Sequence, residues 1–507
     1  MRLLAGLDVG TTAVKAGVVA EDGRLLSVAV EEYALRHPAP DRAELDPEAY
    51  WTASRAALRR AFAAPGVDPQ AVVAIGVSSQ GETVVPVDAG GRAVGPAIVW
   101  LDNRALAEAR LIGDRFGDAD VYDATGVPTV IPTWTACKIL WMRRNEPSRF
   151  AAARRFLLVE DFTISRLTGR FVTEGGVACT SLLYDIRSHG WWEPMLDAVG
   201  IDAARLPELI RPGEVAGALT REAAAELGVR PGVAVVAAGM DQGAGAVGVG
   251  NVAGGIVSES TGGALTVQAT VDAHGRDASR KTPVYVHSAP GRYLYCPVCP
   301  TGGMALTWFR DRFGGEEMAR ASAEGVDAYD LLTAKAAAIP AGSEGLTFLP
   351  HLMGAFSPEY EPEARGAAYG FTLRHGKGHM VRAILEGVAF MLRRNLELLE
   401  GAGARSDEVR SHGGGARSRL WNQIKADACD RPVVTLEGEN AAIRGDALLA
   451  GVATGVFADL DSAVSAAVTT LDRYEPDPRN RRAYDDAYAR YVMYFDAVRP
   501  MFGPDGR

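Results

Sequence analysis

The sequence predicts an α/β protein made of two related domains that flank a central cleft. Its 507 residues exceed one ordinary core, because domains average roughly 150 residues. Short strand-like runs alternate with helical patterns, which is typical of α/β folds. A strand, a Gly/Thr turn and a second strand occur at 5–19 and again at 254–270, and such a repeat indicates two related units. We expect domains at residues 1–250 and 251–507.

Local patterns define the individual elements. The "EDG" at 21–23 predicts a tight turn between two strands. Asp46 and Pro47 are typical of a helix start, with Asp as the cap and Pro at the first position. We expect strands at 3–7, 14–19, 25–30, 71–79, 83–88 and 97–100, and helices at 46–64, from near Arg417, and along the Tyr/Val/Phe stripe of 484–502.

Composition and charge exclude several classes of protein. With 48% hydrophobic and 23% charged residues the chain is globular rather than disordered or fibrous. A net charge of -10 argues against nucleic-acid and anionic-membrane partners, because no broad basic face is available. There is no signal-peptide pattern or unbroken apolar span, so we expect a cytoplasmic protein. Of the five cysteines, Cys296 and Cys299 could form a redox or metal half-site, but packed thiols are the favoured interpretation.

Asp241 is the only charged residue between 233 and 258. An unpaired carboxylate among Ala, Val and Gly is costly unless it is hydrogen-bonded, neutralised or turned toward a polar cleft. One interpretation is therefore a functional site. The other is a helix cap, because Asp before a run of small residues commonly caps a helix, here one starting at Gln242. Position alone leaves both open.

Three glycine-rich turns are candidates for phosphate binding. They lie at 10–12, 261–263 and 413–415, and Asp8 and Asp241 stand beside two of them. Backbone N–H groups approach an anion closely where Cβ atoms are absent, and a helix behind such a turn favours phosphate. The chain has no GxxxxGK[ST], GxGxxG after its first strand, HExxH or GxSxG motif. These features favour phosphoryl transfer on a different nucleotide-binding fold.

The motifs resemble those of the FGGY family of carbohydrate kinases, within the actin, hexokinase and heat-shock ATPase superfamily. "GLDVGTTAVK" is similar to the first phosphate motif, "SESTGGAL" to the second, and "SHGGGARSRLWNQI" to the adenosine motif. Of the two family signatures, "TWTACKILWMRRN" departs at Thr133 and the segment with "HMVRAILE" departs at Ala368. The resemblance covers about residues 3–502 and implies two actin-like, ribonuclease H-like ATPase domains.

The resemblance also implies a role for individual residues. Asp241 matches the catalytic base that accepts the proton of the attacking hydroxyl. Asp8 matches the carboxylate that holds Mg²⁺, largely through water. ATP and Mg²⁺ are the implied cofactors. The positions that match nucleotide-binding groups are Gly10, Thr11, Thr12, Lys15, Thr261, Gly262, Gly263, Gly303, Gly413, Gly414 and Gly415.

The acceptor is less sharply defined by the sequence. "SSQGETVVPVD" lies where the family contacts its sugar, and Gln80, Glu82, Asp102 and Gln242 are the candidate substrate-binding residues. Asp102 could instead form a surface pair with Arg104. Glu82 is similar to the glutamate that glycerol kinases have in this segment. The segment matches the "GQMHG" motif of xylulose kinases only in part. We expect a ketopentose such as xylulose, or a related ketose or polyol.

Other functions remain open beside this one. Glycerol or another short polyol is an alternative acceptor. A protein of a different class, a conformational ATPase of the same superfamily, would hydrolyse ATP without any sugar. The expected partner is a small sugar or polyol, with neither nucleic acid nor membrane, and a homodimer is one arrangement left open.

Overall fold

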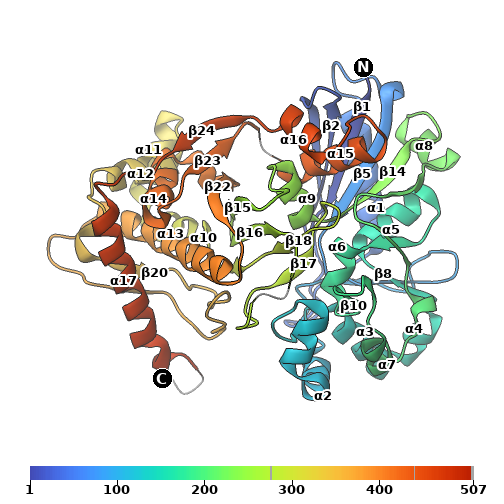
Figure 1. The fold of residues 1–507 in the computed structure, drawn as a ribbon, viewed down its shortest axis with the longest axis horizontal. Helices are drawn as coiled ribbons and strands as arrows, with labels where there is room; N and C mark the ends of the chain where they lie inside the picture. Colours follow the sequence, from blue (N-terminus) through green and yellow to red (C-terminus); the bar gives the residue numbers. More distant parts are fainter. Residues whose placement is uncertain (275–276, 439, 504–507) are drawn as a thin grey trace.

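The computed structural model describes residues 1–274, 277–438 and 440–503. Within these ranges the chain forms one six-stranded and one eight-stranded sheet, which lie in the two halves of the molecule (Figure 1). The first sheet has the order β13 (Val215–Ala218), β14 (Ala234–Met240), β5 (Val72–Ser79), β1 (Leu3–Val9), β2 (Ala13–Ala20) and β3 (Leu25–Glu32). The second has the order β17 (Val284–Val286), β18 (Tyr293–Tyr295), β16 (Leu265–Val271), β15 (Gly255–Thr261), β22 (Ser406–His412), β23 (Val433–Leu436) and β24 (Thr470–Tyr474), and β19 (Val298–Cys299) pairs with β16.

The two sheets share one arrangement around their first strand. β1 pairs antiparallel with β2 and parallel with β5. In the same way β15 pairs antiparallel with β16 and parallel with β22. The repeat predicted from the sequence is therefore confirmed as a repeat of strand pairing, and each Gly/Thr turn joins the antiparallel pair.

Short strands lie outside these sheets. The predicted strands at 83–88 and 97–100 do not join the first sheet, and Pro86, which lacks an N–H to donate, lies in one of the small ladders. The small pairs are β4 (Glu44–Leu45) with β7 (Ala97–Ile98), β6 (Val85–Val87) with β8 (Arg155–Leu157), β9 (Val172–Glu174) with β12 (Glu208–Ile210), β10 (Tyr184–Asp185) with β11 (Gly190–Trp191), and β20 (Thr347–Leu349) with β21 (Ala367–Tyr369).

The helices begin and end at recognisable signals. Asp46 caps the first helix by accepting a hydrogen bond from the Glu48 N–H, and Pro47 occupies the first position as predicted. The helix expected near Arg417 begins at Arg419, behind a short 3₁₀ turn and a Ser418 cap. The helices are α1 (Pro47–Phe62), α2 (Leu106–Thr125), α3 (Thr135–Asn145), α4 (Pro147–Ala152), α5 (Val159–Thr168), α6 (Gly175–Ala178), α7 (Glu193–Val199), α8 (Arg221–Leu227), α9 (Asp241–Gly248), α10 (Met304–Phe313), α11 (Gly315–Glu324), α12 (Ala328–Ala337), α13 (Lys377–Gly401), α14 (Arg419–Cys429), α15 (Ala441–Ala453), α16 (Leu460–Ala467) and α17 (Arg481–Val498).

A helix from the second half covers the first sheet. α15 lies beside β1, β5 and α9 (Figure 1). The approach is so close that a Cβ on Gly6 or Gly76 would lie 2.1 Å from a backbone oxygen of α15. A Cβ on Gly445 would lie 1.8 Å from the Ala244 oxygen of α9. Residues 441–453 therefore pack with the first sheet although they follow β23 in sequence. The division of the chain at residue 250 stays a prediction.

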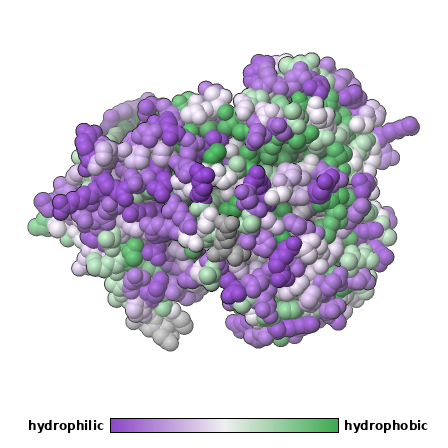
Figure 2. Space-filling view, viewed as in Figure 1, coloured by the Kyte–Doolittle hydropathy of each residue, from purple (hydrophilic) through white to green (hydrophobic). Residues whose placement is uncertain are grey.

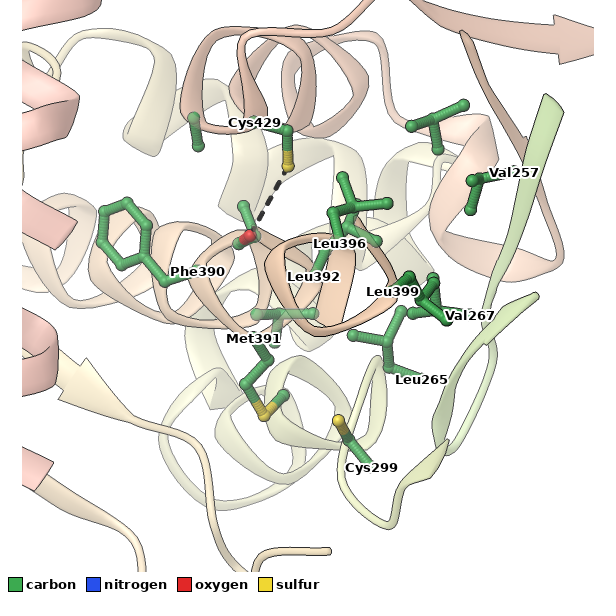
Figure 3. Close-up of a cluster of buried hydrophobic side chains, with 14 of the residues drawn as sticks. Val257, Leu265, Val267, Cys299, Phe390, Met391, Leu392, Leu396, Leu399 and Cys429 are labelled. Carbon is green, nitrogen blue, oxygen red and sulfur yellow. Dashed lines mark hydrogen bonds between the residues drawn. The ribbon is translucent and has the colours of Figure 1, made fainter. Parts of the chain in front are cut away.

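The core of the second half surrounds α13. Figure 3 shows Leu392, Leu396 and Leu399 of this helix facing Val267 and Leu265 of the second sheet. The five cysteines are buried and free, and Cys429 donates a weak hydrogen bond to the Ala389 oxygen at 3.8 Å. The interpretation of Cys296 and Cys299 as packed thiols is confirmed. The terminal helix α17 buries its predicted aromatic stripe.

The surface carries mixed polarity. On the face shown in Figure 2, hydrophilic residues cover most of the half at the left, and hydrophobic residues gather mainly at the right. Across the parts of the chain that the structure describes, no helix is long and apolar enough to cross a membrane.

Candidate active site

A cavity of about 690 Å³ lies where the two halves meet. Asp8, Lys15, Asp241 and Gln242 line it from the first half, and His412, Gly413 and Gly414 line it from the second. The first turn of α15 also borders it. The structure thus brings together candidate residues that stand more than 400 positions apart in the chain.

Asp8 and Lys15 face each other across the first hairpin. They are register partners of β1 and β2, so their side chains lie on one face of the sheet. Burial raises the pKa of the Asp8 carboxyl to about 6, and the Lys15 charge opposes the shift. Asp8 Oδ1 is buried without a hydrogen-bond partner in the structure.

Such an orphaned carboxylate oxygen suits a hydrated cation. Mg²⁺ prefers one or two carboxylates together with waters and substrate phosphates, rather than a cage made by the protein. The described residues contain no cluster of three or more His, Cys, Asp or Glu side chains arranged for a metal. The residues present around Asp8 therefore fit Mg²⁺.

Asp241 lies at the junction between β14 and α9. The helix begins at Asp241 itself, one residue earlier than the capping interpretation requires, and the cap position is Met240 without a side-chain hydrogen bond. The pKa of the Asp241 carboxyl is raised to about 8. Burial is the largest cause, and the charges of Asp8 and Glu82 also contribute to the rise. Asp241 therefore shares its surroundings with two other carboxylates.

A bulge two residues earlier sets the direction of Asp241. Gly239 has a φ of 90°, and the register between β14 and β5 shifts there. The Gly239 N–H donates to Glu160 Oε1 at 2.8 Å, and Glu160 is fully buried. Sequence reasoning missed Glu160, although an acidic residue in the apolar run "FLLVEDFTI" was a signal of a constrained carboxylate.

The first Gly/Thr turn is fixed by neighbouring side chains. The Gly10 oxygen accepts a hydrogen bond from Gln80 Nε2 at 2.9 Å, and Thr11 Oγ1 accepts one from Trp100 Nε1 at 2.8 Å. Thr12 is exposed. Gln80 also donates to the Tyr50 hydroxyl at 3.1 Å and is only 3% exposed. The structure places Gln80 beneath the turn at 10–12, and Gln80 is not among the residues that line the cavity.

The second and third turns touch each other. A Cβ on Gly415 would lie 2.7 Å from Thr261 Cβ, and one on Gly303 would lie 2.5 Å from the Gly262 oxygen. Gly413 has a φ of 78°, a conformation that glycine adopts without strain. Burial lowers the pKa of the His412 imidazole beside this turn, which favours its neutral form.

Glu82 is held rigidly by its main chain. Its φ of 56° lies in the left-handed region, which costs a non-glycine residue about 1–2 kcal/mol. Its main-chain N–H donates to Thr180 Oγ1 at 3.1 Å. Its main-chain carbonyl oxygen accepts hydrogen bonds from Thr135 Oγ1 at 2.9 Å and from Lys138 Nζ at 3.1 Å. No hydrogen bond or ion pair to its carboxylate occurs among the described residues.

Lys138 is a second residue that sequence reasoning missed. It is fully buried, and burial lowers its pKa to about 7 against the opposing charges of Glu82 and Asp102. Burial likewise raises the pKa of Glu82 to about 7, opposed by Lys138. The lysine within the signature-like "TWTACKILW" was the available signal.

Asp102 is fully occupied by protein groups. It accepts hydrogen bonds from the Ala43 N–H at 2.7 Å, the Arg104 N–H at 3.0 Å and the Arg104 guanidinium at 2.7 and 2.8 Å. Asp102 and Arg104 therefore do form an ion pair. The prediction that this pair lies at the surface was wrong, because both side chains are buried. Gln242 borders the cleft, and Gln268 Nε2 donates to its side-chain oxygen at 3.0 Å.

Family models give the chain its place among known proteins. The model of the FGGY carbohydrate kinases, N-terminal domain, matches residues 3–248, and that of the C-terminal domain matches residues 261–454. The chain belongs to the FGGY family of carbohydrate kinases. It is therefore an ATP-dependent sugar kinase, a phosphotransferase with an alcohol group as acceptor. The resemblance and the predicted fold class are confirmed.

The chain is similar to other sugar kinases over almost its whole length. A xylulose kinase of Bacillus subtilis is 28% identical over 501 residues, which are 99% of this chain and 98% of the relative. A gluconokinase of the same organism is 28% identical and covers 95% of this chain and 93% of the relative. The crystal structure of xylulose kinase from Rhodospirillum rubrum has a TM-score of 0.89 at 29% identity, and the match covers 99% of this chain and 100% of that one.

Proposed function

We propose that this sugar kinase transfers the γ-phosphoryl group of ATP to a hydroxyl of a neutral ketopentose of the xylulose type. The observation that carries the proposal concerns Glu82: its main chain is held by hydrogen bonds, and its carboxylate has no hydrogen bond or ion pair among the residues described. A carboxylate in that state accepts hydrogen bonds from sugar hydroxyls and rejects molecules that lack them. The xylulose kinase relatives support the same acceptor.

The charge of the cleft supports a neutral acceptor over an aldonate. Burial raises the pKa of Asp241, and the negative charges of Asp8 and Glu82 raise it as well. The carboxylate of gluconate would add a fourth negative group, and like charges in a partly buried site repel strongly. The buried Lys138 donates to the main-chain oxygen of Glu82, so it already has a role inside the protein.

Asp241 is proposed as the general base. The proton of the acceptor hydroxyl passes to its carboxylate, a new bond forms between the acceptor oxygen and the γ-phosphorus, and the bond to the β-γ bridging oxygen breaks to release ADP. A pKa of about 8 lies close to neutral pH, which suits a group that accepts a proton during the reaction. Asp8 would hold hydrated Mg²⁺, which supplies charge neutralisation to the phosphates when bound.

The glycine turns are proposed to hold the nucleotide. Lys15 and the turn at 10–12 lie on the side of Asp8, and the turns at 261–263 and 413–415 lie across the cleft. The first turn of α15 adds a helix N-terminus to the wall, and helix N-termini favour anions. A cytoplasmic location and a homodimer stay predictions.

A coupled ADP-release assay tests the acceptor. Xylulose, ribulose, glycerol and gluconate are compared by kcat/KM at saturating Mg·ATP. We expect a ketopentose to give the highest value, with glycerol and gluconate at least tenfold lower. A highest value for gluconate would overturn the charge argument, and ADP release that no acceptor increases would favour the conformational ATPase.

A further inference from the structure

A buried ion pair lies directly behind the second and third glycine turns. Lys425 of α14 places its Nζ 2.6 Å from Glu259 Oε1 of β15, and neither side chain is exposed to solvent. Glu259 lies in "SESTGG", beside the second glycine turn, and Lys425 lies in "WNQIKAD", in the helix that follows the third. Neither was assigned a role from the sequence.

The pair is connected to both turns by hydrogen bonds. Thr261, the first residue of the second turn, donates its hydroxyl to Glu259 Oε2 at 2.7 Å. Ser411, which precedes the third turn, donates its hydroxyl to Glu259 Oε1 and lies 3.3 Å from Lys425 Nζ. One carboxylate therefore joins β15, β22 and α14.

The geometry of the strands makes this connection sensitive. Glu259 and Ser411 are register partners in the parallel pair of β15 and β22. The turns that follow these strands are in contact, since a Cβ on Gly415 would lie 2.7 Å from Thr261 Cβ. In addition, Asn422 of α14 donates to the Ala416 oxygen at 2.7 Å. A change at the pair would therefore alter the spacing between the turns.

The hydroxyl of Thr261 also has a defined direction. Its proton is donated inward to Glu259, so this hydroxyl has no proton left for a phosphate oxygen. A phosphate at the second turn would be met by main-chain groups, and the contribution of Thr261 is to hold the turn in place.

Stability alone does not account for the pair. A buried ion pair carries a large desolvation penalty, and well-packed apolar residues of similar volume are often equally or more stable in its place. We propose that Glu259 and Lys425 are positioning residues for ATP, which set the spacing between the turn at 261–263 and the turn at 413–415. This inference rests on the proposed assignment of both turns to the nucleotide.

The experiment separates positioning from folding with a double substitution. Glu259→Leu and Lys425→Met are made singly and together, and each variant is measured for thermal midpoint, KM for ATP, KM for the sugar, and Kd for a non-hydrolysable ATP analogue by calorimetry. We expect both single variants to lose thermal stability, because each leaves one buried charge unpaired. The double variant should recover most of the midpoint.

The nucleotide constants decide the role. In the double variant we expect KM for ATP and Kd for the analogue to stay at least tenfold above the wild-type values, with KM for the sugar within twofold. A purely structural pair would give recovery of both stability and ATP affinity, and that result would overturn the proposal. An equal rise in both KM values would also overturn it.

A second buried pair of the same half provides the control. In α13, Arg382 Nε lies 2.9 Å from Glu386 Oε1. Glu386 also accepts hydrogen bonds from the Gly342 N–H and the Ser343 hydroxyl. Neither residue of this pair is among those that line the cleft. The variant Arg382→Met/Glu386→Leu should leave KM for ATP unchanged whatever its effect on stability.

Two further comparisons keep the outcome interpretable. If the double variant does not fold, Glu259→Gln, which keeps the size and one acceptor oxygen, should raise Kd for the analogue at least threefold, and an unchanged Kd would overturn the proposal. Wild-type protein without sugar-dependent ADP release would contradict the proposed function instead. An active wild type with an unaffected double variant would contradict only the positioning role.

Discussion

Replacing Asp241 by Asn should make the protein more stable and less active at the same time. The folded protein raises the pKa of this carboxyl from 3.8 to about 8, so at pH 7 folding requires either a buried charge or uptake of a proton. The interval of roughly three pH units between 3.8 and 7 corresponds to about 4 kcal/mol. Asp241 is partly exposed, which reduces the penalty, so we expect Asn to add about 1–4 kcal/mol to the free energy of unfolding.

The gain should depend on pH in a defined direction. A carboxyl whose pKa is raised on folding contributes most to stability below its unfolded value, and this contribution is lost as pH rises through the folded value. The difference between Asp241→Asn and wild type should therefore be near zero at pH 4 and should grow up to about pH 8. Thermal unfolding in EDTA, which keeps metal away from Asp8, measures it.

The activity should change in the opposite sense. Asn retains the size of Asp but cannot take the proton of the acceptor hydroxyl, and loss of a general base lowers turnover by about a hundredfold to ten-thousandfold. That range corresponds to about 3–5 kcal/mol in the activation barrier. The ATP constants should change little, because the glycine turns and Asp8 hold the phosphates in the proposed arrangement.

Sugar-dependent ADP release and unfolding are measured on the same preparation of Asp241→Asn. A near-normal rate with a good acceptor would refute the assignment of Asp241 as base. A slow enzyme with a lowered thermal midpoint would refute the electrostatic reasoning, since it would indicate a disturbed fold rather than relief of buried charge. Asn caps helices about as well as Asp, so a capping role predicts no change in either measurement.

Three further predictions test other parts of the structure. Glu82→Ala and Glu82→Gly should both raise KM for the sugar by about 5-fold to 150-fold and leave KM for ATP unchanged, because unpaired sugar hydroxyls cost about 1–3 kcal/mol. The Glu82→Gly protein should be more stable than the Glu82→Ala protein by about 1 kcal/mol, because glycine adopts the positive φ of this position without strain. In urea denaturation, Gly445→Ala, whose Cβ would lie 1.8 Å from a backbone oxygen of α9, should lose about 3 kcal/mol or more, whereas Gly113→Ala, with nothing within 4 Å, should be neutral or slightly stabilising. Burial lowers the pKa of His287 to about 4, so its contribution of about 3 kcal/mol is present above pH 6.5 and is lost as pH falls through 4; His287→Leu should flatten that part of the stability profile.

The strands and turns could be predicted because their signals are local. The pattern of strand, Gly/Thr turn and strand around "DVGTT" and "ESTGG" predicted two hairpins, and the structure has them as β1 with β2 and β15 with β16. The start of α1 follows from Asp46 and Pro47 alone. Asp8 and Asp241 line one cavity for a different reason: both lie in the first half, near the carboxyl ends of β1 and β14, which run parallel to β5 in the same sheet.

The contacts that decide the substrate residues could not be predicted, because they join distant parts of the chain. Asp102 meets the Ala43 N–H, 59 residues away, and Gln80 meets the turn at Gly10, 70 residues away. Both are polar residues in promising motifs, and both have their hydrogen-bonding groups satisfied inside the protein. A motif gives the residue type but does not show whether its polar atoms are still available for a ligand.

Glu82 differs from these two residues in which of its groups the protein uses. Three protein groups bind its main chain, and among the residues described none binds its carboxylate. The main chain of such a residue has little conformational freedom left to lose when a sugar binds. Its hydrogen bonds to the ligand are therefore not offset by an entropy cost of ordering that main chain. The left-handed φ at Glu82 points the same way, because the surrounding structure must impose a conformation that the residue does not favour by itself. Lys138 belongs to this argument, since its buried ammonium donates to the oxygen of Glu82 at 3.1 Å and so fixes the carboxylate through the main chain.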